Sequence, residues 1–456
     1  AIGERLALLQ TTASSEEIRN RLEELNIGRL RIASKGVDRH PDYGRDPAAP
    51  KLIEVDADEQ RARGMYMIGQ VAALRNEVIS MATLHANVSS GSAEALRQLA
   101  LPDGPAEAAQ PPAQIAIVGM GSILPGASDS ATFWANIVDK VDAVTEIPAS
   151  RWDWRQYYDP DRSAPDKIYS KWGGFIDDVP FDPVEFGMPP RSLQSIEPFQ
   201  LLGLLVVKAA LADAGYATRP FNRERTSVVL GAGGGGADLT AGYMVRSTLP
   251  LLFGESASEV NRNADGLLPE WTEDSFPGLL MNVASGRIAN RFDFGGANFT
   301  VDAACASSLA AVYLAIRDLQ TGNSDMAIVG GVDAIQNPFS YLCFSKTQAL
   351  SPTGRCPPFD ADADGIAISE GFAALVLKRL SDAERDGDRV YAVIQGVGAA
   401  SDGRDRSMTA PRPEGQMRAL DRAYAHAGYS PATVGLFEAH GTGTVAGDQA
   451  EVQALT

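Results

Sequence analysis

Short β-branched runs that end in glycine alternate along this chain with longer helical patterns, and this alternation limits the fold more than any other feature. Four such runs occupy residues 114–122, 225–235, 326–334 and 389–398, and the helical patterns between them include 199–216 and 308–322. Near-continuous apolar strands that alternate with helices indicate a mostly parallel sheet covered by helices on both faces. The sequence therefore predicts an α/β fold.

A stretch rich in Pro and Ala, LPDGPAEAAQPPAQ, starts at residue 101 and has no apolar periodicity. It predicts a linker over 101–112, between a segment of residues 1–100 and a long α/β region of residues 113–456. The run at 389–398 echoes the run at 114–122, which indicates a duplicated half-domain. The chain starts with Ala and stops at Thr456 within a helical pattern, so we expect it to be a piece of a longer polypeptide.

Charge and cysteine content exclude several classes of protein. The formal net charge of −18 argues against nucleic acid or an anionic membrane surface as the main partner. Three cysteines cannot build a disulfide framework. The sequence contains no CxxC pair of the kind that binds zinc. With no signal peptide and no apolar run long enough for a bilayer, we expect a cytoplasmic protein that acts without a metal.

Cys305 lies in the stretch VDAACASS, where its neighbours are as small as alanine and serine. The residues before it predict a strand and residues 308–319 predict a helix, with Leu309 and Ile316 among the residues of its apolar face. A thiol at a helix N-terminus feels the positive end of the helix dipole, which favours a thiolate. Small neighbours leave room for an acyl group, so Cys305 is a candidate nucleophile, with a buried inert cysteine as the alternative.

His440 is one of four histidines and stands in the stretch VGLFEAHGTGTVAGDQAE, residues 434–451. The pattern predicts a strand that ends at the histidine and leads into a loop of alternating glycine and threonine. Such a loop lets a polar ligand approach the backbone closely while the threonine hydroxyls donate hydrogen bonds. Sites in α/β proteins form at the carboxyl ends of strands, so His440 is a second candidate site residue.

DAACASS and EAHGTGT, in this order and about 135 residues apart, resemble the β-ketoacyl synthase (ketosynthase) domain of type I polyketide and fatty-acid synthases. The resemblance extends over nearly all of 113–456, through stretches such as IAIVGMGSILPGA, KIYSKWGGFIDDV, ALSPTGRCPPFDADADG and GDQAE. It implies a thiolase-like duplicated α/β fold, preceded by a small α-rich segment. We expect that fold to be truncated in its second half, because the family's second histidine and its lysine would follow Thr456.

The resemblance also implies an acyltransferase chemistry. Cys305 would accept the acyl chain, His440 would assist its condensation with a malonyl-type extender, and Thr442 and Thr444 would hydrogen-bond the phosphopantetheine arm of an acyl carrier protein. The implied partners are acyl and malonyl thioesters, other domains of the same synthase and a second copy in a homodimer. The ketosynthase itself would need no cofactor, because loss of carbon dioxide supplies the carbanion.

Three departures from modular polyketide synthases are informative. The chain has EPFQLL at 197–202 where those proteins have a DPQQR-like stretch, ISEG at 368–371 where they have RGEG, and ASS after the cysteine in place of SSS. These variants look closer to iterative synthases of the polyunsaturated fatty acid, heterocyst glycolipid and enediyne kind.

Two other functions compete with this interpretation. GAGGGG at 231–236 satisfies GxGxxG through Gly231, Gly233 and Gly236 after a predicted strand, which would suit an NAD-dependent dehydrogenase. The fingerprint also requires an acidic residue at the end of the next strand, about 20 residues on. The sequence offers no clear second strand there, and Glu255 lies in a loop-like stretch. The glycines are better explained by close packing beside the acyl site.

The second alternative is a non-catalytic partner such as a chain-length factor. Those proteins resemble ketosynthases but lack the cysteine nucleophile, so Cys305 argues against this alternative.

Residues 1–100 give a separate prediction. TTASSEEIRNRLEEL predicts an amphipathic helix capped by Ser14 or Ser15, and residues 64–88 predict a strand, a glycine turn and a helix. The piece GQVAAL resembles the C-terminal tail of flavin-dependent nitronate monooxygenase or enoyl-reductase barrels. Such a barrel would bind FMN with residues that lie mostly upstream of residue 1. A docking or linker segment is the alternative.

Overall fold

The computed structural model describes residues 14–43, 46–66, 77–98, 113–233, 238–254, 270–334, 336–404 and 410–456. The chain divides into two compact units, residues 1–109 and 110–456. The predicted linker at 101–112 lies outside the described residues. Among the described residues, no helix is long and apolar enough to cross a membrane.

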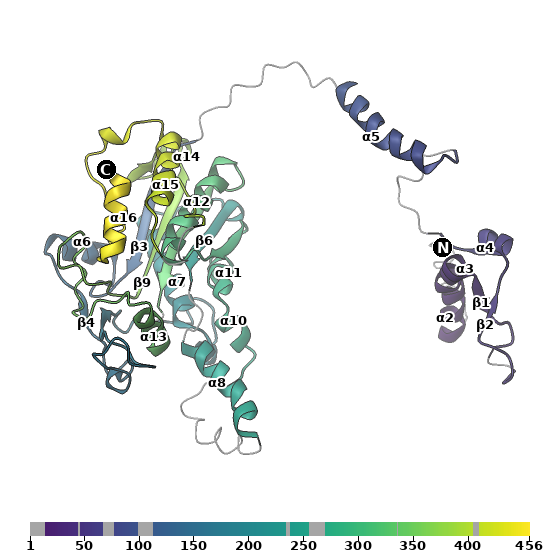
Figure 1. Ribbon diagram of the computed structural model, residues 1–456, viewed down its shortest axis with the longest axis horizontal. Coiled ribbons are helices and arrows are strands. Elements are labelled where there is room, and N and C mark those ends of the chain that lie inside the picture. Colours follow the sequence, from purple (N-terminus) through teal and green to yellow (C-terminus); the bar gives the residue numbers. More distant parts are fainter. Residues whose placement is uncertain are drawn as a thin grey trace. The chain divides into compact units, whose positions relative to one another are not determined.

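The first unit consists of short helices and a two-stranded antiparallel sheet (Figure 1). Its elements are α2 (Ser15–Glu23), the π-helix η1 (Glu24–Gly28), α3 (Arg29–Lys35), β1 (Val37–Arg39), β2 (Leu52–Glu54), α4 (Ala57–Arg63) and α5 (Met81–Gln98). The predicted cap is Ser14, whose hydroxyl accepts a hydrogen bond from the Glu17 N–H at 3.3 Å while the Glu17 carboxylate accepts one from the Ser14 N–H. Helix α5 confirms the predicted helix only from residue 81, because residues 77–80 form no helix and residues 64–66 form no strand, while residues 67–76 lie outside the described residues.

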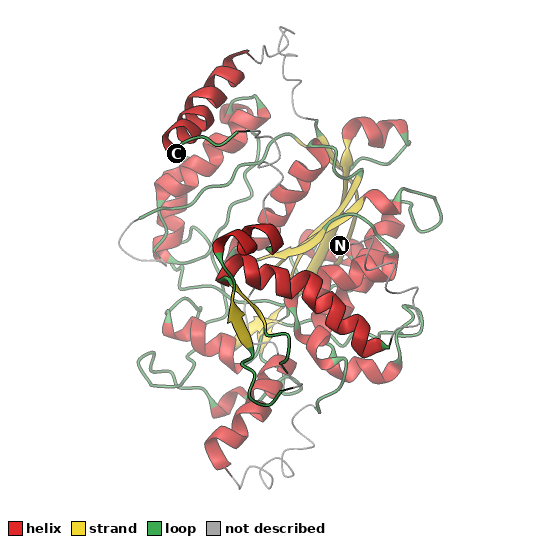
Figure 2. Cartoon of the chain, turned by 90° about the vertical axis from the view of Figure 1, so that its right-hand side faces the viewer, coloured by secondary structure: helices red, strands yellow, loops and turns green. Residues whose placement is uncertain are grey.

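The second unit is built on a six-stranded sheet, which Figure 2 shows in yellow. Its order is β10 (Ala392–Ile394), β3 (Ile115–Ile123), β9 (Gly371–Arg379), β8 (Met326–Asp333), β6 (Thr226–Ala232) and β7 (Asn298–Val301). Strand β6 runs parallel to β7 and β8, whereas the β10–β3, β3–β9 and β8–β9 pairs are antiparallel. The predicted mostly parallel sheet is therefore wrong, and the sheet is mixed.

Strand β9 explains why the predicted sheet was mostly parallel. It is an apolar run like its neighbours, but it was not among the four predicted runs. The chain reaches it after the long connection 334–370, which contains α13 (Pro338–Lys346), and not through a simple crossover helix. A strand buried on both faces has the same apolar pattern whichever way it runs, so its direction depends on the path of that connection.

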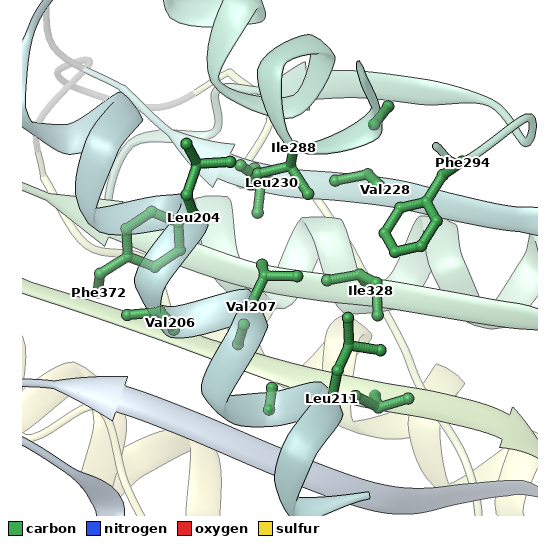
Figure 3. Close-up of a cluster of buried hydrophobic side chains, with 14 of the residues drawn as sticks. Leu204, Val206, Val207, Leu211, Val228, Leu230, Ile288, Phe294, Ile328 and Phe372 are labelled. Atoms are coloured by element: carbon green, nitrogen blue, oxygen red, sulfur yellow. The ribbon is translucent and has the colours of Figure 1, made fainter. Parts of the chain in front are cut away.

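Helices cover both faces of the sheet, as predicted. On one face α7 (Pro198–Asp213) and α11 (Met281–Phe292) bury Leu204, Val207 and Ile288 against Val228, Ile328 and Phe372 (Figure 3). On the other face α12 (Ser307–Gln320) packs Ala311, Ala315, Ile316 and Leu319 against Val229 and Val329. The predicted apolar face of this helix was partly wrong, because Leu309 is 71% exposed and the alanines make the close contact.

The remaining elements surround this core. They are α6 (Ser130–Val138), β4 (Val144–Glu146), η3 (Trp154–Gln156), β5 (Trp172–Gly174), η4 (Pro190–Ser195), η5 (Arg223–Arg225), α8 (Asp238–Phe253), α10 (Ser275–Leu279), η7 (Ala304–Ala306), α14 (Leu380–Arg385), α15 (Pro413–Ala427), η8 (Pro431–Thr433) and α16 (Val445–Leu455).

The strand predicted to deliver His440 is not present. Residues 434–444 form no strand, and Leu436 and Phe437 are 85% and 45% exposed. A strand needs a neighbouring strand to pair with as well as a suitable pattern, and no described strand pairs with these residues. Apolar alternation alone therefore predicted the wrong local structure.

Candidate active site

Cys305 occupies the middle of a one-turn 3₁₀ helix, η7, that connects β7 to α12. Ala304 has a φ of 50°, in the left-handed region where a side chain other than glycine is strained. Ser307 holds the turn: its hydroxyl accepts a hydrogen bond from the Ala303 N–H at 2.8 Å and donates one to the Ala304 carbonyl at 2.7 Å. The strand-to-helix turn is therefore as sharp as the sequence predicted, and it leaves Cys305 exposed.

Two glycines let neighbouring strands approach this turn. A Cβ on Gly231, in β6, would lie 2.4 Å from the backbone of Ser307, and a Cβ on Gly331, in β8, would lie 2.5 Å from the Cβ of Ser308. Real Cβ atoms do not approach other atoms so closely, so both positions require glycine. The start of α12 thus sits directly on the ends of β6 and β8.

These contacts also show what the glycines of the GAGGGG loop, residues 231–236, pack against. Gly231 packs on Ser307, and a Cβ on Gly233 would lie 2.5 Å from Asp302 Oδ1, while Gly236 lies outside the described residues. Two of the three glycines that would have to approach a pyrophosphate, Gly231 and Gly233, instead lie against Ser307 and Asp302. This packing supports the prediction that the loop binds no nicotinamide dinucleotide.

A cavity of about 540 Å³ opens beside Cys305. Its walls come from the ends of β6 and β8, the Cys305 turn, α13 and the start of β9, and they include Gly231, Cys305, Ser308, Gln336, Phe344 and Glu370. Burial raises the pKa of the Glu370 carboxyl, and hydrogen bonding by the Ile176 N–H and the charge of Arg151 oppose that rise. The thiol therefore faces a space of the size that a small-molecule site requires.

His440 is held by its backbone. The N–H groups of His440 and Gly441 donate hydrogen bonds of 2.6 and 2.8 Å to the two oxygens of the Glu451 carboxylate, which is buried on α16. The imidazole-bearing residue is exposed and is not part of the wall of the Cys305 cavity. Different segments therefore position the two predicted residues: the η7 turn holds Cys305, and the carboxylate of α16 holds the backbone of His440.

The loop after His440 docks on the segment 356–365. The Cys356 thiol donates to the Thr442 carbonyl at 3.2 Å, and the Gly365 N–H donates to the Gly443 carbonyl at 2.9 Å. Asp448, buried on α16, accepts hydrogen bonds from the N–H groups of Gly443 and Phe359 at 3.0 and 2.6 Å. Because residues 369–371 and Ala373, a little further along the chain, line the Cys305 cavity, this docking connects the histidine loop to the cavity wall.

Thr442 and Thr444 already make local hydrogen bonds. Thr444 is the N-cap of α16 and accepts from the Gly447 N–H at 3.1 Å, and its hydroxyl lies 2.9 Å from that of Thr442. Thr442 also accepts from the Thr444 N–H at 3.3 Å. Both threonines therefore fix the start of the helix, and a carrier arm would add to these contacts or displace them.

Two models of known protein families match the second unit of this chain. The model of the β-ketoacyl synthase N-terminal domain matches residues 113–383, and that of the C-terminal domain matches residues 391–456. The chain belongs to the β-ketoacyl synthase family. Its predicted α/β class and its resemblance to the ketosynthases are thus confirmed, and membership of this family of condensing acyltransferases leaves the dehydrogenase alternative without support.

The chain is similar to segments of much longer curated proteins. It is 40% identical over 350 residues to a polyunsaturated fatty acid synthase protein of a Thraustochytrium species, and 37% identical over 350 residues to the polyketide synthase PksN of Bacillus subtilis. These alignments cover 75% and 76% of this chain but only 12% and 6% of the relatives. The chain therefore spans a small part of the length of the proteins it matches.

Solved structures agree with this assignment. The oxazolomycin ketosynthase domain OzmH KS7 of Streptomyces albus aligns with a TM-score of 0.65 and 35% identity, over 75% of this chain and 55% of that one. The ketosynthase from module 6 of the bacillaene synthase of Bacillus subtilis aligns with a TM-score of 0.62 and 34% identity, over 75% and 53%.

Several residues that shape the site were not identified from sequence. Asp448 and Glu451 were quoted only as part of a family stretch, although their spacing of three places both carboxylates on one face of a helix. Ser307, Gln336 and Glu370 gave no local signal, because their roles depend on which distant segments meet around the cavity.

Proposed function

We propose that residues 113–456 act as a ketosynthase that catalyses decarboxylative Claisen condensation in polyketide or fatty-acid biosynthesis. The observation that carries the proposal is the placement of Cys305. It is an exposed thiol on a strained strand-to-helix turn, at the N-terminus of a helix, beside a cavity of about 540 Å³, within a chain of the β-ketoacyl synthase family.

Acylation is the first step. The Cys305 sulfur, having given up its proton, attacks the carbonyl carbon of an acyl thioester, and the carrier thiolate leaves and takes up a proton. The products are an acyl group on Cys305 and a free carrier thiol. The small residues Ala304, Ser308 and Gly331 around the sulfur leave room for this tetrahedral centre.

Condensation follows on the same sulfur. A malonyl-type thioester loses carbon dioxide, and the electron pair of the broken bond forms an enolate whose carbon attacks the acyl carbonyl on Cys305. The Cys305 thiolate then leaves, and the product is a β-ketoacyl thioester on the carrier. His440 would donate a hydrogen bond to the enolate oxygen as its charge develops.

Carrier recognition completes the proposal. An acyl carrier protein would present its phosphopantetheine arm to the loop of Thr442 and Thr444, which starts α16 beside His440. The arm belongs to the carrier protein and arrives with the substrate, so it is not a cofactor of this chain. The condensation requires neither a metal nor a redox group, because decarboxylation supplies the carbanion. Residues 1–100 contain no glycine-rich phosphate-binding stretch, and the FMN barrel to which they would belong stays a prediction.

Of the three cysteines, Cys356 is the least suited to be a nucleophile. Burial and the nearby charges of Asp448 and Asp364 raise the pKa of its thiol, and that thiol donates a hydrogen bond to the backbone of the histidine loop. Cys343 is exposed but lies within α13 and outside the wall of the cavity. Neither has the helix N-terminus that Cys305 has.

Mass spectrometry tests this assignment. We expect a chain incubated with an acyl N-acetylcysteamine thioester to carry the acyl group on the peptide that contains Cys305, and Cys305→Ala to carry none. The Cys343→Ala variant is the matched control and should be acylated as fast as the unmodified chain. Acylation of Cys343 or Cys356 with Cys305 unlabelled would contradict the proposal.

A further inference from the structure

A second cavity meets the Cys305 cavity at two side chains. It has a volume of about 260 Å³, and Gln336 and Glu370 are part of its wall as well as part of the wall beside Cys305. We call it the far cavity. Both shared residues are buried, with 6% of each exposed. A chain attached to the Cys305 sulfur that extended from the first cavity toward the far cavity would reach it past Gln336 and Glu370.

The wall of the far cavity combines two kinds of residue. The apolar residues include Val179, Phe181, Leu201, Leu202 and Leu205. The charged residues include the carboxylates of Glu197 and Asp238 and the guanidinium of Arg151. Such a wall suits a ligand that is mostly hydrocarbon but carries polar hydrogen atoms at a defined place.

The residues at the junction offer hydrogen-bond acceptors. Gln336 Oε1 is buried and has no hydrogen-bond partner in the part of the chain that the structure describes. Glu370 accepts hydrogen bonds from Arg151 and from the Ile176 N–H, both at 2.8 Å and both on Oε2, so that Oε1 takes part in neither. A buried polar atom without a partner costs free energy, and a ligand that supplies the missing donor recovers it.

We propose that Gln336 and Glu370 form a junction that selects acyl chains bearing a hydroxyl group over fully reduced chains of the same length. The inference rests on the proposed function, because it needs an acyl group on Cys305. The hydroxyl hydrogen would satisfy Gln336 Oε1 as the chain enters the far cavity. A saturated chain would bring only methylene groups to this acceptor and leave it unpaired, which disfavours its binding.

Competing thioesters test the selection. The complete chain would be incubated with N-acetylcysteamine thioesters of butyrate, hexanoate, 3-hydroxyhexanoate and 5-hydroxyhexanoate, and the rate of Cys305 acylation would be followed by mass spectrometry. We expect at least one hydroxyhexanoyl thioester to react about tenfold faster than hexanoyl. In Gln336→Leu, which keeps the side chain's bulk and removes its amide, this preference should fall to roughly threefold or less.

Gln449→Leu is the matched control, because Gln449 is exposed on α16 and outside both cavity walls. It should keep the full preference. If Gln336→Leu does not fold, Ala334→Leu serves instead: it adds bulk to the far cavity, and should slow the six-carbon thioesters relative to butyryl. Equal acylation by hexanoyl and both hydroxyhexanoyl thioesters, or an unchanged preference in Gln336→Leu, would overturn the inference. Failure of every thioester to acylate Cys305 would overturn the proposed function itself.

Discussion

At the scale of single residues, Cys305 is held by contacts within its own turn, whereas His440 is held by contacts from other segments of the chain. Cys305 is held by side chains of its own turn, chiefly Ser307, so a short stretch of sequence was enough to predict its geometry. His440 is held from outside by Glu451 and by the segment that includes Cys356. The histidine could be recognised from its glycine–threonine loop, but the predicted strand before it was wrong, because a strand depends on neighbours that a local pattern does not contain.

The His440→Ala variant tests the division of labour between the two residues. Because Glu451 binds the backbone of His440 and Gly441, removal of the imidazole should leave the loop in place. We expect acylation of Cys305 to stay within about twofold of normal and the rate of β-ketoacyl product formation to fall roughly 10²-fold or more. The two steps are measured by mass spectrometry of the acyl adduct and by chromatography of the product.

Glu451→Gln is the accompanying variant. It retains one carbonyl oxygen for the two backbone N–H groups, so it should loosen the loop and lower the condensation rate while Cys305 still becomes acylated. If His440→Ala reduced both steps equally, the histidine would instead support the fold or activate the thiol.

At the scale of elements, the site depends on how closely β6 and β8 approach the start of α12. The sequence predicted strands β3, β6 and β8 and helices α7 and α12, because buried apolar runs and helical periodicity are local properties. It did not identify β9 or the antiparallel pairs, because these depend on the path of a long connection. The glycines of the GAGGGG loop were attributed to close packing, and the structure specifies their contacts as the backbone of Ser307 and the side chain of Asp302.

The Gly231→Ala variant tests this packing. Its Cβ would lie 2.4 Å from backbone atoms of Ser307, which cannot rotate away, so β6 and the Cys305 turn must move apart. We expect a loss of about 1–3 kcal/mol in the free energy of unfolding and slower acylation of Cys305. Denaturant melts and acylation rates would measure the two effects. Gly435→Ala is the control, because no atom outside its own neighbours lies within 4 Å of the added Cβ and it should change neither. An unperturbed Gly231→Ala would show that the turn does not depend on this contact.

At the scale of the whole molecule, the second unit leaves an apolar surface uncovered on α8. Met244, Leu251, Leu252 and Phe253 are 63%, 85%, 70% and 49% exposed. Trp271 is also 58% exposed, and its ring centroid lies 4.5 Å from that of the buried Tyr243 on the same helix. Contiguous exposed apolar residues of this kind mark interaction sites. We propose a second copy of this chain as the occupant, because the family resemblance implies a homodimer and a two-fold interface would place this surface against its copy.

The Leu252→Glu variant tests whether α8 forms that interface. In a two-fold dimer each substitution occurs twice, so two carboxylates would be buried without partners, and we expect the dimer dissociation constant to rise at least about tenfold. Sedimentation equilibrium would measure it. Val138→Glu is the matched control, because Val138 is 60% exposed on α6 and the variant has the same net charge. A chain with a formal charge of −18 repels its own copy, and the control separates this long-range repulsion, which salt screens, from local burial on α8. Equal weakening in both variants, or a monomer before any substitution, would contradict an interface on α8.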